Sequence, residues 1–205
     1  MQVPVSHHQY VLLDTDAEAP FEDIDDRRAG SGLVSVNAQG TYASVKTGTP
    51  HGDLDVTFDI QPAEAQADFE GWDEVVEVSL HFSGDGPLAG DPVSDDYVNV
   101  PLLGEEDDFQ WWRFRIHARG RDTAHDPSTP PEQHLIQIWP APRAPEIRHK
   151  LTDQTGHRRR DPDPDYYARA KAAEAAAGNL PEGAAYTSQR VTPLVASLEE
   201  EDQRP

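Results

Sequence analysis

The stretch at residues 109–119, FQWWRFRIHAR, constrains the fold more than any other part of the chain. Its second half places apolar or small side chains at Phe114, Ile116 and Ala118, and charged or polar side chains between them. A period of two is typical of a β-strand that packs one face on a core and turns the other to solvent. The adjacent bulky residues Trp111 and Trp112 interrupt that phase, and this predicts a β-bulge at their position.

Seven further segments have the composition or the alternation of strands. They are residues 8–14, 33–36, 41–47, 54–60, 72–82, 97–103 and 133–140. Residues 54–60 show the clearest pattern, because four apolar side chains alternate there with Asp55, Thr57 and Asp59. The strands follow one another closely, and no stretch before residue 140 is long enough for the helical crossovers of a parallel sheet. The sequence therefore predicts an all-β fold, an antiparallel β-sandwich of jelly-roll type with about eight strands, over residues 6–140.

The character of the chain changes after residue 140. Prolines are frequent between residues 140 and 164, where the basic run HRRR also lies, and large apolar residues are sparse. Such a composition is typical of an extended linker. Residues 166–177, YYARAKAAEAAA, are strong helix formers with almost no large apolar face. Residues 141–205 are therefore predicted to be a flexible tail with a proline-rich linker, a short α-helix and a disordered end.

The net charge of −21 is unevenly placed along the 205 residues. Residues 1–112 carry 24 acidic side chains and three basic ones, whereas residues 113–205 carry 14 of each. A negative field of this kind repels nucleic acid and anionic membranes and attracts basic proteins. Three interpretations stay open: a well-hydrated surface, adaptation to a salt-rich cytoplasm, and a surface shaped for a basic partner.

Several classes of function find no support in the sequence. The chain has no cysteine, which excludes disulfides, thiolate metal sites and cysteine nucleophiles. Its serines lack the Gly-x-Ser-x-Gly setting, it has no glycine-rich phosphate loop, and no pair of carboxylates stands out from the acidic background. We assign no catalytic residue and no cofactor. No apolar run is long enough to span a bilayer, and the first residues do not resemble a secretory signal, so we expect a cytoplasmic protein.

Histidines on the expected strands offer one alternative. His81, His117 and His134 lie on three of these strands, and such side chains converge on a metal ion in some jelly rolls. The two-histidine spacing of the cupins is absent, however, and ordinary histidines on strand faces are the simpler interpretation.

The arginines of residues 113–121 form the one basic island next to the acidic region. As a binding site they would grip an anion or an acidic partner. Cross-strand ion pairs with neighbouring acidic strands are the favoured alternative, because carboxylates are so abundant there.

The order of the central strands resembles the competence protein J family. The resemblance covers residues 6–140 and is carried by four features: the strand at residues 7–13, the glycine-flanked hairpin at residues 32–47, the amphipathic strand at residues 54–60 and the late aromatic strand. The segments RGRD (residues 119–122) and IQIWP (residues 136–140) resemble hallmarks of a related group of actinobacterial proteins. The family consists of small acidic bacterial proteins that inhibit a DNA-entry nuclease. Its members have no catalytic residues, so the resemblance implies none in this chain.

Charge and resemblance together lead to the expectation of a non-enzymatic acidic binding protein, such as an inhibitor or immunity protein for a nuclease or another basic protein. The residues expected at the interface are Asp53, Asp55, Asp59, Glu105, Glu106, Asp107, Asp108, Arg119 and Arg121. Direct contact with nucleic acid or membrane is not expected. Two alternatives stay open: a metal-dependent or small-ligand jelly-roll enzyme that uses the three histidines, and a scaffold domain that binds through its tail.

Overall fold

Strands dominate the computed structural model, which describes residues 1–14, 30–94, 96–104 and 109–160. These residues form eleven strands, a short 3-10 turn, η2 (Arg121–Thr123), and one helix, α1 (Gln154–Arg160). The strands are β1 (Gln2–Ser6), β2 (Gln9–Leu13), β3 (Val34–Val36), β4 (Tyr42–Lys46), β5 (His51–Ile60), β6 (Glu74–Phe82), β7 (Leu88–Asp91), β8 (Asp96–Asn99), β9 (Gln110–Arg119), β10 (Gln133–Pro140) and β11 (Ile147–Leu151). The predicted all-β class is confirmed.

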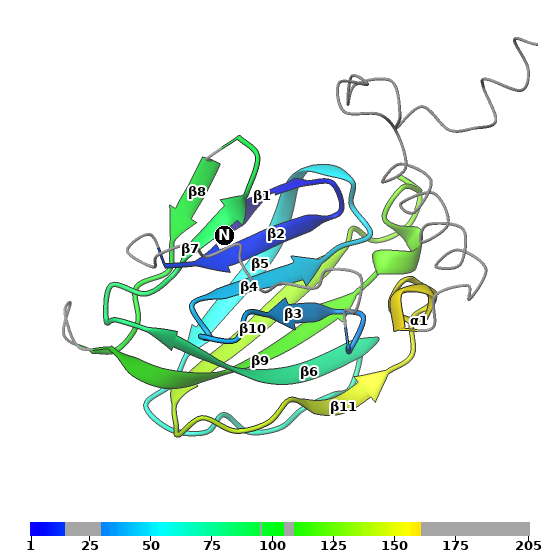
Figure 1. Ribbon diagram of the computed structural model, residues 1–205. Helices are drawn as coiled ribbons and strands as arrows, with labels where there is room; N and C mark the ends of the chain where they lie inside the picture. The colour runs from blue at the N-terminus through cyan, green and yellow to red at the C-terminus, as the bar shows by residue number, and fades with distance from the viewer. Residues whose placement is uncertain (15–29, 95, 105–108, 161–205) are drawn as a thin grey trace, which may run out of the picture. The chain divides into compact units, whose positions relative to one another are not determined.

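All eleven strands belong to one continuous sheet with the order β11-β6-β9-β10-β5-β1-β2-β4-β3, and β7 adds to β2 and carries β8 (Figure 1). The sheet is mixed, because β10 runs parallel to β5 while the other pairs are antiparallel. The sequence predicted a purely antiparallel sandwich. Alternation reports which face of a strand is buried but not the direction of its neighbour, and the chain makes the long excursion through β6–β9 before β10 returns beside β5.

The sheet curls until β3 comes to lie near β6, so that its two ends face a common core (Figure 1). The backbone amide of His81 on β6 donates to the carbonyl of Gly40, in the turn before β4, at 2.8 Å. Fully buried side chains from both halves of the sheet fill the space between, among them Leu12, Val56, Trp112 and Ile136. Because the halves share one core, strands far apart in the sequence are held together by apolar burial.

Strand β9 lies in the middle of this arrangement, with β6 on one side and β10 on the other. Its register with β6 is unbroken from Gln110 to Ala118, so the bulge predicted at Trp111–Trp112 is wrong. Trp112, not Trp111, shares the core face with Phe114, and the indole N–H of Trp112 donates to the carbonyl of Phe82 at 3.1 Å. Trp111 is accommodated on the opposite face, where it is half-buried beneath the guanidinium of Arg143.

The second face of β9 is also buried, although the sequence suggested that it meets solvent. Arg113 and Arg115 are 3% and 1% exposed, and both bind Glu77 on β6, at 2.7 Å and 3.0 Å. Further donors reach backbone carbonyls, from Arg115 to Ala65 and from Arg113 to Ala144, and Arg115 also binds the carboxylate of Glu64. The favoured interpretation of these two arginines as cross-strand ion pairs is therefore confirmed, but the pairs lie under two covering segments of the chain.

The stretch expected to be an extended linker from residue 141 contributes to the sheet. Strand β11 pairs antiparallel with the edge of β6, with a register shift between Arg148 and Lys150, and α1 follows it. Both belong to the same compact unit as β1–β10. The prolines of residues 140–145 precede β11, which lies at the sheet edge, where a strand needs few apolar residues. The helix expected at residues 166–177 lies outside the described residues.

Candidate functional site

Three of the expected interface residues follow the exposed face of β5. Asp53 and Asp55 are exposed, because Leu54 and Val56, which alternate with them along the strand, point into the core. Asp59, further along the strand, is half-buried and accepts hydrogen bonds from the side chains of Gln61 and Gln137, at 2.6 Å and 3.3 Å. The expectation that alternation places these carboxylates on one outward face agrees with the structure.

The residues opposite this acidic row carry no charge. Asp53 lies opposite Pro4 of β1, and Asp55 lies between Gln2 of β1 and Gln133 of β10. Cross-strand neighbours are the groups that normally neutralise a charged strand face. The one ion pair found in this row among the described residues joins Asp55 to the Met1 amino group, at 3.9 Å. The negative charge of β5 is thus directed to solvent.

The two arginines of the expected interface have different environments. Arg119 is exposed at the end of β9, where its guanidinium stacks 4.8 Å from the Trp72 ring and donates to the Oε1 atom of Gln133. Since Gln133 lies between Arg119 and Asp55 in the register of the sheet, Arg119 borders the acidic row. The acids at residues 105–108 lie outside the described residues.

Arg121 cannot serve as an interface residue in this fold, because its side chain is fully buried. The guanidinium binds Asp153 through two nitrogen atoms, at 2.6 Å and 2.9 Å, and donates to the carbonyls of Gly32 and Lys46. The expectation of a surface role was wrong because η2 folds inward under α1. Glu74, 3.8 Å from Arg121, is buried with it, and burial raises the pKa of Glu74 to about 6 although nearby arginines oppose that rise.

The three histidines considered as metal ligands are not brought together. His134 faces the core, whereas His117 on the neighbouring strand faces the opposite side of the sheet, against the rings of Phe69 and Trp72. His81 lies near the far end of the β6–β9 ladder, six register positions from the partner of His117 or roughly 20 Å along the strands. Among the described residues no group of three or more potential ligands is placed to hold a metal ion.

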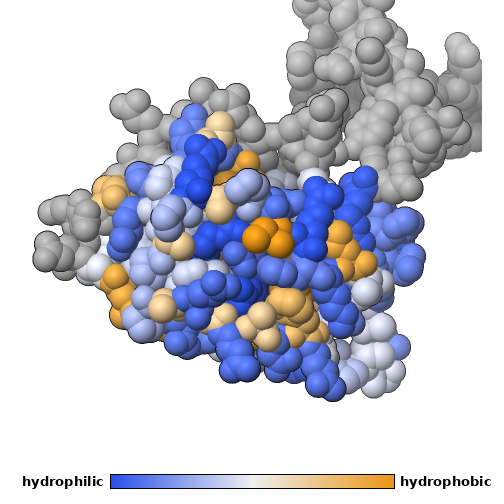
Figure 2. Space-filling view, turned by 90° about the horizontal axis from the view of Figure 1, so that it is seen from below, coloured by the Kyte–Doolittle hydropathy of each residue, from blue (hydrophilic) through white to orange (hydrophobic). Residues whose placement is uncertain are grey.

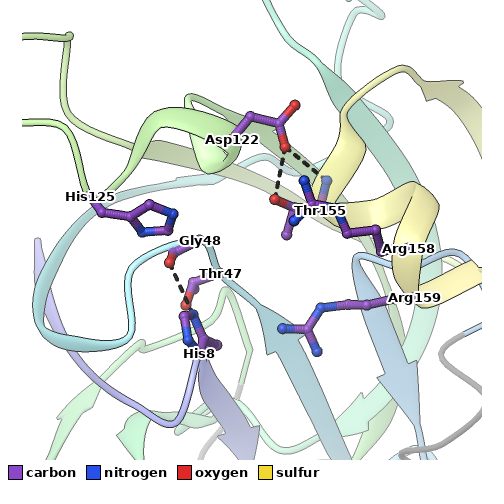
Figure 3. Close-up of a pocket in the computed structure, with 8 residues that line it drawn as sticks. All are labelled: His8, Thr47, Gly48, Asp122, His125, Thr155, Arg158 and Arg159. Carbon is purple, nitrogen blue, oxygen red and sulfur yellow. Dashed lines mark hydrogen bonds between the residues drawn. The ribbon is translucent and has the colours of Figure 1, made fainter. Parts of the chain in front are cut away.

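A hollow with a volume of about 270 Å³ opens where the turn after β1, the segment after β4, the turn after β9 and helix α1 meet (Figure 3). We call it the basic hollow. Its lining consists of His8, Thr47, Gly48, Asp122, His125, Thr155, Arg158 and Arg159. The side chains of His125 and Arg159 reach toward the opening from opposite sides, and His8 lies below it (Figure 3). The lining thus contains two arginines and two imidazoles but one carboxylate.

The backbone that carries His8 is unusual. His7 and His8 form the two-residue connection between β1 and β2, and both have positive φ angles, 51° and 61°. Two such residues are the mark of a type I′ turn, for which Asn-Gly is the common choice, because other side chains crowd the backbone there. The imidazole Nδ1 atom of His8 lies 3.0 Å from the carbonyl oxygen of Gly48. This contact holds the ring against the wall of the basic hollow.

The floor of the hollow is rigid. A side chain on Gly48 would collide with the Arg121 backbone, since its Cβ atom would lie 1.9 Å from that carbonyl oxygen. The Gly48 amide donates to the carboxylate of Glu132, which is 3% exposed and which also binds Thr49 and the Nε2 atom of His134. Burial alone would raise the pKa of Glu132, but the hydrogen bond from His134, its charge and the bonds from Thr49 lower it to about 2.

Asp122 is the one acidic group in the lining, and it is fully engaged. It accepts hydrogen bonds from the amides of Gln154 and Thr155 and from the Thr155 hydroxyl, each at 2.8 Å. Burial acts to raise the pKa of Asp122, yet these donors outweigh it and hold the pKa below its ordinary value. Asp122 thus fixes the start of α1, which brings Arg158 and Arg159 to the hollow.

The sequence did not reveal the basic hollow. Its residues come from four segments, and each segment alone had an ordinary explanation: a terminal His-His pair, a glycine turn, a polar loop and a basic run in a linker. The run HRRR was the one local signal that pointed to a concentration of positive charge.

Among the residues that the structure describes, no helix has both the length and the apolar character that a membrane crossing requires. No family model matches the sequence, and no curated protein matches it. One solved structure, named crocagin biosynthetic gene J, aligns with 68% of this chain and 94% of its own, at 13% identity and a TM-score of 0.41.

Proposed function

We propose that this chain is a non-enzymatic binding protein that takes a basic protein partner on its acidic surface. The observation that carries the proposal is the row of Asp53, Asp55 and Asp59 on β5, whose cross-strand neighbours are uncharged. A row of carboxylates with uncharged cross-strand neighbours projects a field that accelerates the approach of a cationic protein and orients it.

The burial of four basic side chains supports this proposal. Lys46, Arg113, Arg115 and Arg121 are buried and bind groups inside the protein, so they do not shield the surface acids. The face seen in Figure 2 is mainly hydrophilic, with hydrophobic residues scattered over it and not merged into one patch. Among the described residues on that face, no merged apolar patch is seen that would dock a partner by apolar burial.

An inhibitor or immunity protein for a nuclease is the specific form that we favour. A row of carboxylates imitates the phosphates that a nuclease cleft binds, and the resemblance of residues 6–140 to the competence protein J family points to the same class. The proposal includes a cytoplasmic location, which the absence of cysteine accommodates.

The test begins with capture of basic proteins on the immobilised full chain, followed by association kinetics with the purified partner. The double variant Asp53→Asn/Asp55→Asn should keep the melting temperature, slow association and flatten its dependence on salt. Asp85→Asn/Asp96→Asn is the matched control, since it removes the same charge from two other exposed acids. Equal slowing by both variants would mean that only net charge matters, and no slowing by either would refute the interface.

A further inference from the structure

We propose that the basic hollow is a binding site for the phosphate group of a small phosphorylated molecule. The site is distinct from the acidic row and does not depend on the proposed function. The two surfaces use different strands and opposite charge: β5 carries the acids, whereas the turn after β1, the turn after β9 and α1 supply the lining of the hollow.

The donor set of the basic hollow is that of an oxyanion site. Arg158 and Arg159 bring guanidinium groups, whose planar N–H donors match phosphate oxygens and form the stronger, charge-assisted class of hydrogen bond. His8 and His125 bring imidazole nitrogens. Because Nδ1 of His8 faces the Gly48 carbonyl, it must donate there. Nε2 is the atom left to face a ligand, and it donates to an oxyanion only when the ring carries a proton on both nitrogens.

The one acidic group in the lining, the carboxylate of Asp122, is compatible with this assignment. The carboxylate of Asp122 already accepts three hydrogen bonds from α1, at the edge that holds the helix in place. Thr155 donates its hydroxyl proton to the same carboxylate, and the Thr47 hydroxyl donates to the Thr49 carbonyl at 2.7 Å. The side chains in the lining that bear N–H donors are those of the arginines and histidines, and these are the groups that would meet the anion.

The hollow is also preorganised, which lowers the entropy lost on binding. Gly48 is fixed by Glu132 and by contact with the Arg121 backbone, and α1 is fixed by Asp122 and by the buried Arg121–Asp153 pair. The left-handed turn at His7 and His8 has a strained backbone, and such strain concentrates at sites of function.

The size of the site indicates what surrounds the phosphate. A volume of about 270 Å³ exceeds what one phosphate ion fills and lies at the low end of small-molecule pockets, which begin at roughly 300 Å³. The class that fits is a small phosphate monoester, such as a sugar phosphate. The opening to solvent leaves room for the group attached to the phosphate.

The experiment is a calorimetric titration of the full chain with inorganic phosphate, with ribose 5-phosphate and with ribose, supported by amide NMR shifts of Gly48 and Thr155. We expect ribose 5-phosphate to bind more tightly than phosphate, and ribose not to bind. Arg158→Gln/Arg159→Gln should weaken binding about tenfold or more, because charge-assisted hydrogen bonds are lost.

Arg148→Gln is the control for charge. Arg148 is exposed on β11, is not part of the lining of the hollow, and binds Glu146 at 2.6 Å. This substitution should leave the affinity unchanged, and His125→Gln should weaken binding while leaving the melting temperature unchanged. Failure of both phosphate ligands to bind would overturn the proposal. Equal weakening by the Arg148 and the Arg158/Arg159 variants would also overturn it. The Asp53/Asp55 variant should bind ribose 5-phosphate normally, so failure of the two proposals can be told apart.

Discussion

Arg121 and Asp153 are joined by a bidentate ion pair that is almost completely buried. The Nε atom of Arg121 donates to Oδ2 at 2.6 Å and its Nη2 atom donates to Oδ1 at 2.9 Å, and the exposed fractions of the two side chains are 0% and 2%. Asp153 also accepts from the Gly156 amide at 2.6 Å. The pair thus ties the turn after β9 to the start of α1 and supports the basic hollow from below.

Asp153→Ala should destabilise the protein by about 3–5 kcal/mol, because it leaves the buried guanidinium of Arg121 without its main partner. Urea denaturation followed by tryptophan fluorescence measures the change. Asp85→Ala, at an exposed position, should change the free energy of unfolding by less than about 0.5 kcal/mol. A similarly small loss of stability in Asp153→Ala would show that Glu74 alone compensates the charge of Arg121.

Truncation of the two adjacent tryptophans should have unequal effects. Trp112 is fully buried and donates to the Phe82 carbonyl, so Trp112→Ala should cost about 3–5 kcal/mol out of a total stability of roughly 5–15 kcal/mol. Trp111 is half-buried on the other face of β9, and Trp111→Ala should cost clearly less. Thermal and urea denaturation of both variants provide the comparison, and equal losses would contradict the observed register of β9.

Stability should fall in acid because of Glu132. Its pKa is lowered to about 2 in the folded protein, below the ordinary value of about 4.3, so the folded state favours the charged form. The stability that this group contributes is present above its unfolded pKa and is lost as pH falls from about 5 toward 2. Glu132→Gln should be less stable near neutral pH and should show a shallower acid loss. If the free energy of unfolding of Glu132→Gln depends on pH as that of the unchanged protein does, Glu132 is excluded as a source of the acid sensitivity.

In the folded protein the imidazole of His117 should remain neutral at pH values at which the same imidazole is protonated in the unfolded chain. Burial is the main cause of its lowered pKa, the charge of Arg115 adds to it, and the Nδ1 contact with the Leu135 carbonyl opposes it. Its buried Nε2 atom has no hydrogen-bond partner among the described residues. A depressed histidine pKa means that stability falls as pH drops through the ordinary value of about 6.5.

NMR titration of the imidazole signals, with His117→Gln for assignment, checks this expectation. The signal of His117 should titrate at lower pH in the folded protein than in urea. Titration at the same pH in both states would show that the imidazole is hydrated.

The fold was predictable where one strand face is apolar and the other polar, as in β5 with Leu54 and Val56 against Asp53 and Asp55. It was not predictable where the polar face is covered by a later segment. Arg113 and Arg115 alternate with core residues as solvent-facing residues do, yet Glu77 and the carbonyls of residues 65 and 144 accept from their donors. Nothing in a period of two distinguishes water from a backbone carbonyl as the acceptor.

The acidic row and the basic hollow also differ in how far the sequence predicts them. The acidic row was predictable because Asp53, Asp55 and Asp59 share one strand, and local alternation determines where they point. The basic hollow depends on His8 and Arg159, which are far apart in the chain and meet only because Asp122 and Asp153 hold α1 against the turn after β9. Strand β11 escaped prediction because a single pairing with β6 needs few apolar residues.

The parallel pairing of β5 with β10 has a consequence for synthesis of the chain. Strand β5 leaves the ribosome long before residues 133–138 exist, so one of its edges lacks its partner until the sheet can close. Unpaired strand edges are templates for aggregation, and charged side chains on such strands are the usual protection. Asp53, Asp55 and Asp59 would thus act as gatekeepers that keep nascent chains apart during that interval.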